Sequence, residues 1–325
     1  METEQKTKFD TAFEEEVYEG LTAFPKYLSS KWFYDKKGDK LFQQIMDLPE
    51  YYLTGSELSI IEENKINLSK LFAAAEGFDL VELGAGDGKK TKILLQELEN
   101  SKSKFTYKPV DISQNVLDEL EEDVLKKWPQ LNIQTEQGTY FDILNKLSKR
   151  KKDRKMVILV LGSNIGNLSH KQAVEFLKTI QQSMHKDDLL FMGFDQKKNP
   201  EVILNAYNDS QGITEAFNKN LLFRINNELG GNFDLEKFKH WPVYNPENGT
   251  TKSFLVSTTD QTVKIQKLNL DIHFAAWESI HTEISQKYDD DIVNWLAQES
   301  GLQIEIKYSD SKNYFTDYIF KVKNI

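Results

Sequence analysis

The middle of the chain alternates short apolar runs with amphipathic stretches, which is typical of successive β-strands and α-helices on a parallel sheet. Strands are predicted at 78–83, 105–110, 156–161 and 189–194. The run 156–161 (MVILVL) is the most apolar in the chain, as expected of a central strand covered on both faces. The pattern therefore predicts an α/β fold.

Helical periodicity follows the first two predicted strands. A helix is predicted over 91–98, and Ser113 is placed to cap a second helix that carries Val116, Leu117 and Leu120. The last forty residues offer a helix around 292–296 and then two strand-like runs, which are separated by Ser309, Asp310 and Ser311. The two runs, 302–308 and 314–322, are predicted to form a closing antiparallel hairpin.

Two blocks interrupt this alternation. Residues 1 to about 60 are helical and aromatic-rich. The block from about 197 to 286 holds predicted helices at 202–207 and 214–229, a break at Gly230-Gly231, and β-type runs at 253–258 and 263–268. We infer a second, α+β domain from 1–61 with 197–286, beside a core from 62–196 with 287–325.

Composition narrows the possible partners. The 325 residues are 39% hydrophobic and 28% charged, which describes an ordered globular protein. A net charge of −10 opposes attraction to nucleic acid or an anionic membrane, and no apolar segment approaches the roughly 20 residues that span a bilayer. The basic run Lys149 to Lys155 (KRKKDRK) is interpreted as a solvated loop. We expect no nucleic-acid partner and no membrane association.

The absence of cysteine excludes disulfides, thiolate nucleophiles and cysteine-ligated metals, and it is compatible with a cytoplasmic location. Five scattered histidines leave little for a metal cluster, so no metal is expected.

The most informative stretch is Glu82 to Gly88 (ELGAGDG), which directly follows the first predicted core strand and opens a helix. Glycines there let the backbone come close to a ligand, and the helix N-terminus offers unpaired N–H groups. A dinucleotide fingerprint would need a third glycine where Lys89 stands. The spacing E-x-G-x-G-x-G instead resembles motif I of the S-adenosylmethionine-dependent methyltransferases. A glycine-rich connection without a ligand is the alternative.

Two further segments follow predicted strands at the edge where open α/β sheets bind ligands. Asp111 ends the second strand, where a carboxylate can accept both hydroxyls of a ribose. The segment Gly162 to Asn167 (GSNIGN) follows the central strand. It is either part of a site or a tight turn that needs positive φ angles.

Ordered motifs over nearly the whole chain resemble the histidine Nα-methyltransferases of ergothioneine biosynthesis, which make hercynine. The markers are 24–26 (FPK), 31–35 (KWFYD), 48–54 (LPEYYLT), 81–91, 161–168 (LGSNIGNL), 206–207 (AY), 212–220 (GITEAFNKN) and 282–288 (TEISQKY). The resemblance implies a doubly wound, Rossmann-like methyltransferase core, a substrate-binding second domain, S-adenosylmethionine as cofactor, and an amino-acid substrate. We expect a cytoplasmic monomer.

The resemblance also implies roles for individual residues. Those lining the cofactor are Gly84, Lys90 and Asp111, with Thr139 and Tyr140 flanking the adenine. Those gripping the substrate carboxylate are Asn167 and Tyr207. Those addressing the imidazole are Tyr51, Glu283 and Ser285, and Tyr34 lies near the reacting amine, where it is the candidate catalytic residue.

Three positions depart from the family pattern. Thr139 stands where Asp is common beside the adenine, Ser253 stands where an apolar residue such as Met lines the imidazole pocket, and Gln286 stands where Cys is frequent.

Three other functions remain as alternatives to histidine methylation. They are an N-methyltransferase of another amine, of the tryptophan-derivative type, a nicotinamide-dependent oxidoreductase, and a binding module without turnover. Glu283 and Ser285 suit a polar ring and speak against a tryptophan derivative.

Overall fold

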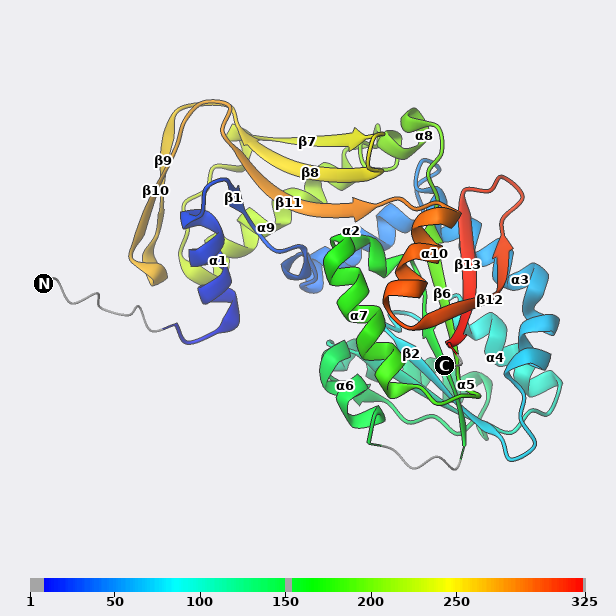
Figure 1. Cartoon of the computed structure of the whole chain (residues 1–325). Helices are drawn as coiled ribbons and strands as arrows, with labels where there is room; N and C mark the ends of the chain where they lie inside the picture. The colour runs from blue at the N-terminus through cyan, green and yellow to red at the C-terminus, as the bar shows by residue number, and fades with distance from the viewer. Residues whose placement is uncertain (1–8, 150–153, 324–325) are drawn as a thin grey trace, which may run out of the picture. The chain divides into compact units, whose positions relative to one another are not determined.

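The computed structural model describes residues 9–149 and 154–323, so residues 150–153 of the predicted solvated loop lie outside the described residues. The chain divides into two compact units. Figure 1 colours the chain by residue number, so the stretches that make up each unit can be followed in it. The smaller unit comprises Met1–Tyr51 and Lys198–Ser285, and the larger comprises Tyr52–Lys197 and Gln286–Ile325. Each unit is therefore built from two separate stretches of chain.

The first boundary differs from the prediction. Residues 52–61, which the sequence placed in the second domain, belong to the larger unit. They form the first half of a continuous helix, α3 (Tyr52–Phe72). Its buried side chains, among them Ile61, Leu68 and Phe72, pack into a core of the larger unit, and this packing keeps the whole helix there.

The larger unit is built on a seven-stranded sheet in the order β12-β13-β6-β5-β2-β3-β4. Its strands are β2 (Phe78–Leu83), β3 (Phe105–Asp111), β4 (Glu136–Gln137), β5 (Lys155–Val160), β6 (Leu189–Asp195), β12 (Leu302–Ser309) and β13 (Phe315–Val322). The strands from β6 to β4 pair in parallel, whereas β13 pairs antiparallel with both β6 and β12. The four predicted parallel strands and the closing hairpin are confirmed.

Helices cover both faces of this sheet. One buried cluster contains side chains of α3, α4 (Thr91–Asn100) and α5 (Gln114–Lys127), and the other contains those of α6 (Tyr140–Leu147), α7 (His170–Ser183) and α10 (Asp290–Glu299). Along β5, Ile158 belongs to one cluster and Val157 and Leu159 belong to the other, as alternation along a strand requires. The predicted doubly wound α/β core is confirmed.

Local signals explain where several of these helices begin. Ser113 caps α5, since its side chain accepts a hydrogen bond from the Val116 N–H at 3.4 Å, as predicted. Ser169 and Gln172 form a reciprocal capping box at the start of α7. Among the described residues, none of the helices combines the length and the apolar character needed to cross a bilayer.

The smaller unit packs helices against a four-stranded sheet in the order β1-β11-β8-β7. Its helices are α1 (Ala12–Thr22), α2 (Lys36–Met46), α8 (Pro200–Asn205) and α9 (Ile213–Leu229), with 3-10 turns η1 (Ser30–Phe33), η3 (Leu235–Lys237) and η4 (Gln266–Leu268). Its strands are β1 (Lys26–Tyr27), β7 (Phe238–Asn245), β8 (Thr250–Ser257), β9 (Gln261–Ile265), β10 (Leu270–Phe274) and β11 (Ser279–Gln286), of which β9 and β10 form a separate hairpin.

Sequence patterns predicted part of this unit. The helices α8 and α9 and the strands β8 and β9 lie where they were expected, and α9 ends at Gly230, whose φ of +66° is left-handed. The strands β7, β10 and β11 were not predicted. For β7 the reason is Pro242, which argues against a central strand but is tolerated at the sheet edge that β7 occupies.

Candidate active site

The glycine turn lies at the carboxyl end of β2 in the larger unit. Gly84, Gly86 and Gly88 have φ angles of +77°, +53° and +63°, a region that other residues rarely adopt. The N–H groups of Gly84 and Ala85 donate to the Val110 carbonyl at 2.8 and 3.1 Å, which ties the turn to the end of β3. The turn therefore has a fixed shape beside the neighbouring strand.

The three glycines have different surroundings. A Cβ atom on Gly84 would lie 2.3 Å from the Tyr140 hydroxyl, and one on Gly88 would lie 2.5 Å from a methyl group of Leu120. A Cβ atom on Gly86 would meet nothing within 4 Å. Side chains therefore pack closely against Gly84 and Gly88, whereas the backbone at Gly86 faces open space that a ligand can enter.

Asp111 ends β3 beside this turn. Its Oδ2 accepts the Gly86 N–H at 3.2 Å, and its Oδ1 accepts the Ser113 N–H at 3.0 Å. A carboxylate offers about four lone-pair positions, so two remain for further donors. The side chain therefore retains acceptor positions for the two adjacent hydroxyls that the prediction assigns to it.

The predicted adenine-flanking residues begin α6. Thr139 caps this helix: its hydroxyl accepts the Asp142 N–H at 3.3 Å and donates to the Asp142 carboxylate at 2.7 Å. Burial, reinforced by the negative charges of Asp111 and Glu82, raises the pKa of Tyr140, which keeps its phenol neutral. The structure brings Tyr140 to Gly84 and leaves Thr139 exposed.

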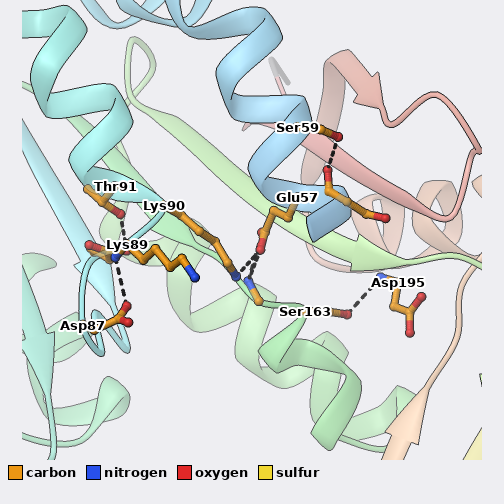
Figure 2. Close-up of polar contacts among 11 residues, drawn as sticks. Glu57, Ser59, Asp87, Lys89, Lys90, Thr91, Ser163 and Asp195 are labelled. Atoms are coloured by element: carbon orange, nitrogen blue, oxygen red, sulfur yellow. Dashed lines mark hydrogen bonds and ion pairs between the residues drawn. The ribbon is translucent and has the colours of Figure 1, made fainter. Parts of the chain in front are cut away.

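Lys90 has a partner that the sequence did not indicate. Its ammonium forms an ion pair with Glu57, a residue of α3 whose side chain is completely buried (Figure 2). The sequence does contain an indication that Glu57 is buried, because this residue shares the apolar face of α3 with Leu53, Ile60 and Ile61 at helical spacing.

The loop after β5 is a tight turn that continues into η2 (Asn164–Asn167). Gly162 and Ser163 have φ angles of +80° and +56°, so the reading as a positive-φ turn is confirmed. The Ser163 hydroxyl accepts the Asp195 N–H at 3.0 Å (Figure 2). Asn167 is exposed, whereas the Asn164 amide nitrogen lies 3.2 Å from the Cβ position of Gly84. Asn164 belongs to the loop predicted from the sequence, but no role was predicted for it.

Polar side chains predicted to bind substrate gather in the smaller unit. Tyr207, which follows α8, donates from its hydroxyl to Ser285 Oγ at 2.7 Å. Ser253 on β8 donates to Glu283 Oε2 at 3.4 Å. Because Glu283 and Ser285 are two residues apart on β11, their side chains share one face of the strand. The structure therefore joins these residues in two hydrogen-bonded pairs.

Tyr34 and Tyr51 meet at a common aromatic residue of the smaller unit. Their rings pack edge-on against Phe42, with centroid separations of 5.6 and 6.3 Å. Tyr34 also packs edge-on against Phe217 at 5.8 Å and remains 40% exposed. Asn167, by contrast, belongs to the larger unit together with the predicted cofactor residues.

Comparison with known proteins shows the family of this chain. Residues 13–322 match the family model described as "Histidine-specific methyltransferase, SAM-dependent". The chain belongs to this family. It is 36% identical to the histidine N-alpha-methyltransferase of Mycolicibacterium smegmatis, over 90% of this chain and 89% of that one. It is 25% identical to the 4-dimethylallyltryptophan N-methyltransferase of Trichophyton verrucosum, over 92% of this chain and 90% of that one.

Family membership identifies the chain as an S-adenosylmethionine-dependent methyltransferase, and the nicotinamide alternative is wrong. The larger unit fits this cofactor on its own geometry. The backbone at Gly86 is open, and the Asp111 carboxylate retains acceptor positions for a ribose diol.

Glu82 gives the methyltransferase core a testable pH dependence. Its buried carboxylate accepts hydrogen bonds from Thr91 and Tyr107, and burial raises its pKa to about 7 from the ordinary 4.5. The folded state therefore holds this proton more tightly than the unfolded state, and the stability that Glu82 contributes at low pH is lost as pH rises toward 7. Glu82→Gln keeps the neutral form at every pH.

We expect the stability of Glu82→Gln relative to the unchanged protein to increase by roughly 2–3 kcal/mol between pH 5 and pH 8. Urea unfolding at both pH values measures this difference. The same change at the exposed Glu122 is the control. A difference that stays constant with pH would contradict the assignment of a neutral Glu82.

Proposed function

We propose that this methyltransferase transfers methyl groups from S-adenosylmethionine to the α-amine of L-histidine, up to the trimethylated betaine hercynine. The substrate assignment rests on two polar side chains of β11: Glu283 accepts a hydrogen bond from Ser253, and Ser285 accepts one from Tyr207. A carboxylate accepts an imidazole N–H and favours a protonated ring, and hydroxyl groups can serve either ring nitrogen.

The role that we propose for each side chain follows from its chemistry. When bound, S-adenosylmethionine supplies an already activated methyl group. The protein therefore has to orient a neutral amine in line with that group and to exclude water. Asp111 binds the ribose hydroxyls, and Glu283 holds the imidazole. Asn167 and the Tyr207 hydroxyl donate to the substrate carboxylate, for which Tyr207 turns away from Ser285.

Tyr34 is the proposed group beside the amine. Its ring is held against Phe42 and Phe217, and its 40% exposure leaves it open to water. A proton released by the amine can pass through a water molecule to the Tyr34 hydroxyl, or the amine can lose its proton to solvent before it binds.

The second candidate substrate is a tryptophan derivative, because a relative 25% identical to this chain carries that name. The buried Ser253 and the carboxylate of Glu283 speak against it. An apolar ring packed against them would take the Glu283 carboxylate out of water without donating a hydrogen bond to it, at a cost of about 1–3 kcal/mol.

Incubation with isotope-labelled S-adenosylmethionine and a panel of free amino acids, with products analysed by mass, tests the proposal. We expect histidine to yield species carrying one, two and three added methyl groups. Histamine, which has the ring and the amine but no carboxylate, should be a poor substrate. Methylation of tryptophan derivatives without methylation of histidine would overturn the substrate assignment.

Glu283→Ala should raise the Michaelis constant for histidine roughly tenfold, because it leaves an imidazole N–H without its acceptor, which costs about 1–3 kcal/mol. It should also lower the ratio of kcat/KM for histidine to kcat/KM for tryptophan. Steady-state kinetics at saturating S-adenosylmethionine measure both effects. Asp271→Ala, at an exposed carboxylate on β10, is the matched control. An unchanged Michaelis constant would show that Glu283 does not contact the ring.

A further inference from the structure

Glu57 connects two loops of the methyltransferase core through one carboxylate. Its two oxygens each lie 2.9 Å from the Gly162 N–H, which donates to them. The same carboxylate forms the ion pair with Lys90 (Figure 2). Its side chain is 0% exposed, whereas that of Lys90 is 18% exposed. The pair therefore buries its anion and turns its cation toward solvent.

The two connected loops belong to neighbouring strands. Lys90 directly precedes α4, just beyond the glycine turn that follows β2, and Gly162 lies just beyond the end of β5. Since β2 and β5 are adjacent and parallel, both loops lie at the same edge of the sheet. This is the edge at which open α/β sheets bind their ligands. Glu57 thus holds both loops at the edge that carries the glycine turn and Asp111.

The sheet is shaped to admit this side chain. A Cβ atom on Gly193 of β6 would lie 2.4 Å from Glu57 Oε1 and 2.6 Å from the Phe315 ring, so the glycine leaves room for both side chains. Asp317 on β13, paired with Gly193 across the sheet, is also completely buried. Burial, followed by the charge of Glu57, raises the pKa of Asp317 well above its usual range, which keeps Asp317 neutral. Lys90 is then the cation that balances Glu57.

A buried ion pair is weak evidence for stability, because removing charges from water offsets most of their attraction. Its geometric effect is clearer. A lysine side chain is long and flexible, and a buried carboxylate fixes its ammonium in one place. A fixed, partly exposed cation at this edge suits the carboxylate of the methionine portion of S-adenosylmethionine.

We propose that Glu57 is a positioning residue for S-adenosylmethionine, which it serves by fixing the Lys90 ammonium and the Gly162 N–H. This inference rests on the proposed role of Lys90 at the cofactor. Glu57 itself need not touch the cofactor. Its effect on cofactor affinity passes through Lys90 and through the loop that begins at Gly162.

Calorimetric titration with S-adenosylhomocysteine tests this inference without any methyl acceptor. Glu57→Gln keeps the shape and one acceptor for Gly162 but releases Lys90, and we expect the dissociation constant to rise about tenfold, as for the loss of one charge-assisted hydrogen bond. If Glu57 only neutralised Lys90, the same change would tighten binding of the cofactor carboxylate. Unchanged or tighter binding therefore overturns the proposal.

A double-mutant cycle separates positioning from a general structural effect. Lys90→Met should weaken binding by itself, and adding Glu57→Gln to it should change the dissociation constant by less than about threefold. Full multiplication of the two effects would show that Glu57 does not act through Lys90. Should Glu57→Gln fail to fold, Glu57→Asp keeps the charge but shortens its reach, and it too should weaken binding. Unchanged affinity in Glu57→Asp would then overturn the proposal.

Asp188→Asn is the matched control. Asp188 is a buried carboxylate that accepts the Met156 and His185 N–H groups at 2.6 and 2.7 Å, and Met156 lies at the opposite, amino end of β5. It should leave the dissociation constant unchanged. If the unchanged protein binds S-adenosylhomocysteine but methylates no histidine, the proposed substrate fails and this inference stands. If histidine is methylated and Glu57→Gln binds normally, this inference alone fails.

Discussion

Asp195→Ala should lower the free energy of unfolding by about 3–5 kcal/mol, the usual cost of breaking a buried ion pair from one side. Asp195 and Lys287 lie 2.7 Å apart, and their side chains are 1% and 0% exposed. The Tyr52 hydroxyl lies 2.9 Å from both carboxylate oxygens, to which it donates. Alanine would remove the carboxylate that contacts both the buried Lys287 ammonium and the Tyr52 phenol.

Urea unfolding near neutral pH measures this loss. Adding Lys287→Met to Asp195→Ala should recover much of it, because an apolar side chain can replace a buried charge without desolvation cost. The control is Asp123→Ala, which breaks the exposed Lys92–Asp123 pair, where the carboxylate side chain is 65% exposed. Such pairs contribute at most about 1 kcal/mol. Equal losses in the two alanine variants would contradict the prediction.

The position of this cluster in the chain gives it a second consequence. Tyr52 is the first residue of the larger unit, Asp195 ends β6 shortly before the chain leaves that unit, and Lys287 follows shortly after the chain returns. The three side chains therefore fasten together the places where the larger unit is interrupted. We therefore expect Tyr52, Asp195 and Lys287 to contribute more to the free energy of unfolding of the larger unit than their burial alone would.

The core of the larger unit could be predicted from sequence because its central strands are buried on both faces. The run 156–161 is apolar throughout, the run 78–83 is interrupted only by Asp79 and Glu82, and a glycine follows each of them. The strands β10 and β11 of the smaller unit lack this signal. They alternate buried and more exposed positions and include polar residues such as His273 and Glu283, so their apolar runs are too short to stand out.

The candidate site was predictable where a residue type is tied to a backbone shape. The glycine turn and Asp111 are of this kind, since positive φ angles and a strand-ending carboxylate leave a mark on the sequence. Glu57 and Lys287 were missed because charged residues are usually at the surface. Only the partner shows why such a residue is buried, and Lys90 and Asp195 are far away in sequence.

Asp111→Ala should have the largest effect on the cofactor. A ribose diol donating to one carboxylate makes two charge-assisted hydrogen bonds, each worth about 1.5–3 kcal/mol. Alanine also removes the acceptor for the Gly86 and Ser113 N–H groups, which hold the glycine turn against β3 and the start of α5. We therefore expect the dissociation constant for S-adenosylhomocysteine to rise at least a hundredfold.

Calorimetric titration measures this loss, and two further variants locate its cause. Asp111→Asn keeps the size of the side chain but loses its charge and half of its acceptor capacity, so it should bind with intermediate affinity. Asp118→Ala, at an exposed carboxylate on α5 that accepts from Gln114, should bind normally. If Asp111→Asn bound as tightly as the unchanged protein, the carboxylate would not be the ribose acceptor. The weakening in Asp111→Ala would then come from the loosened turn alone.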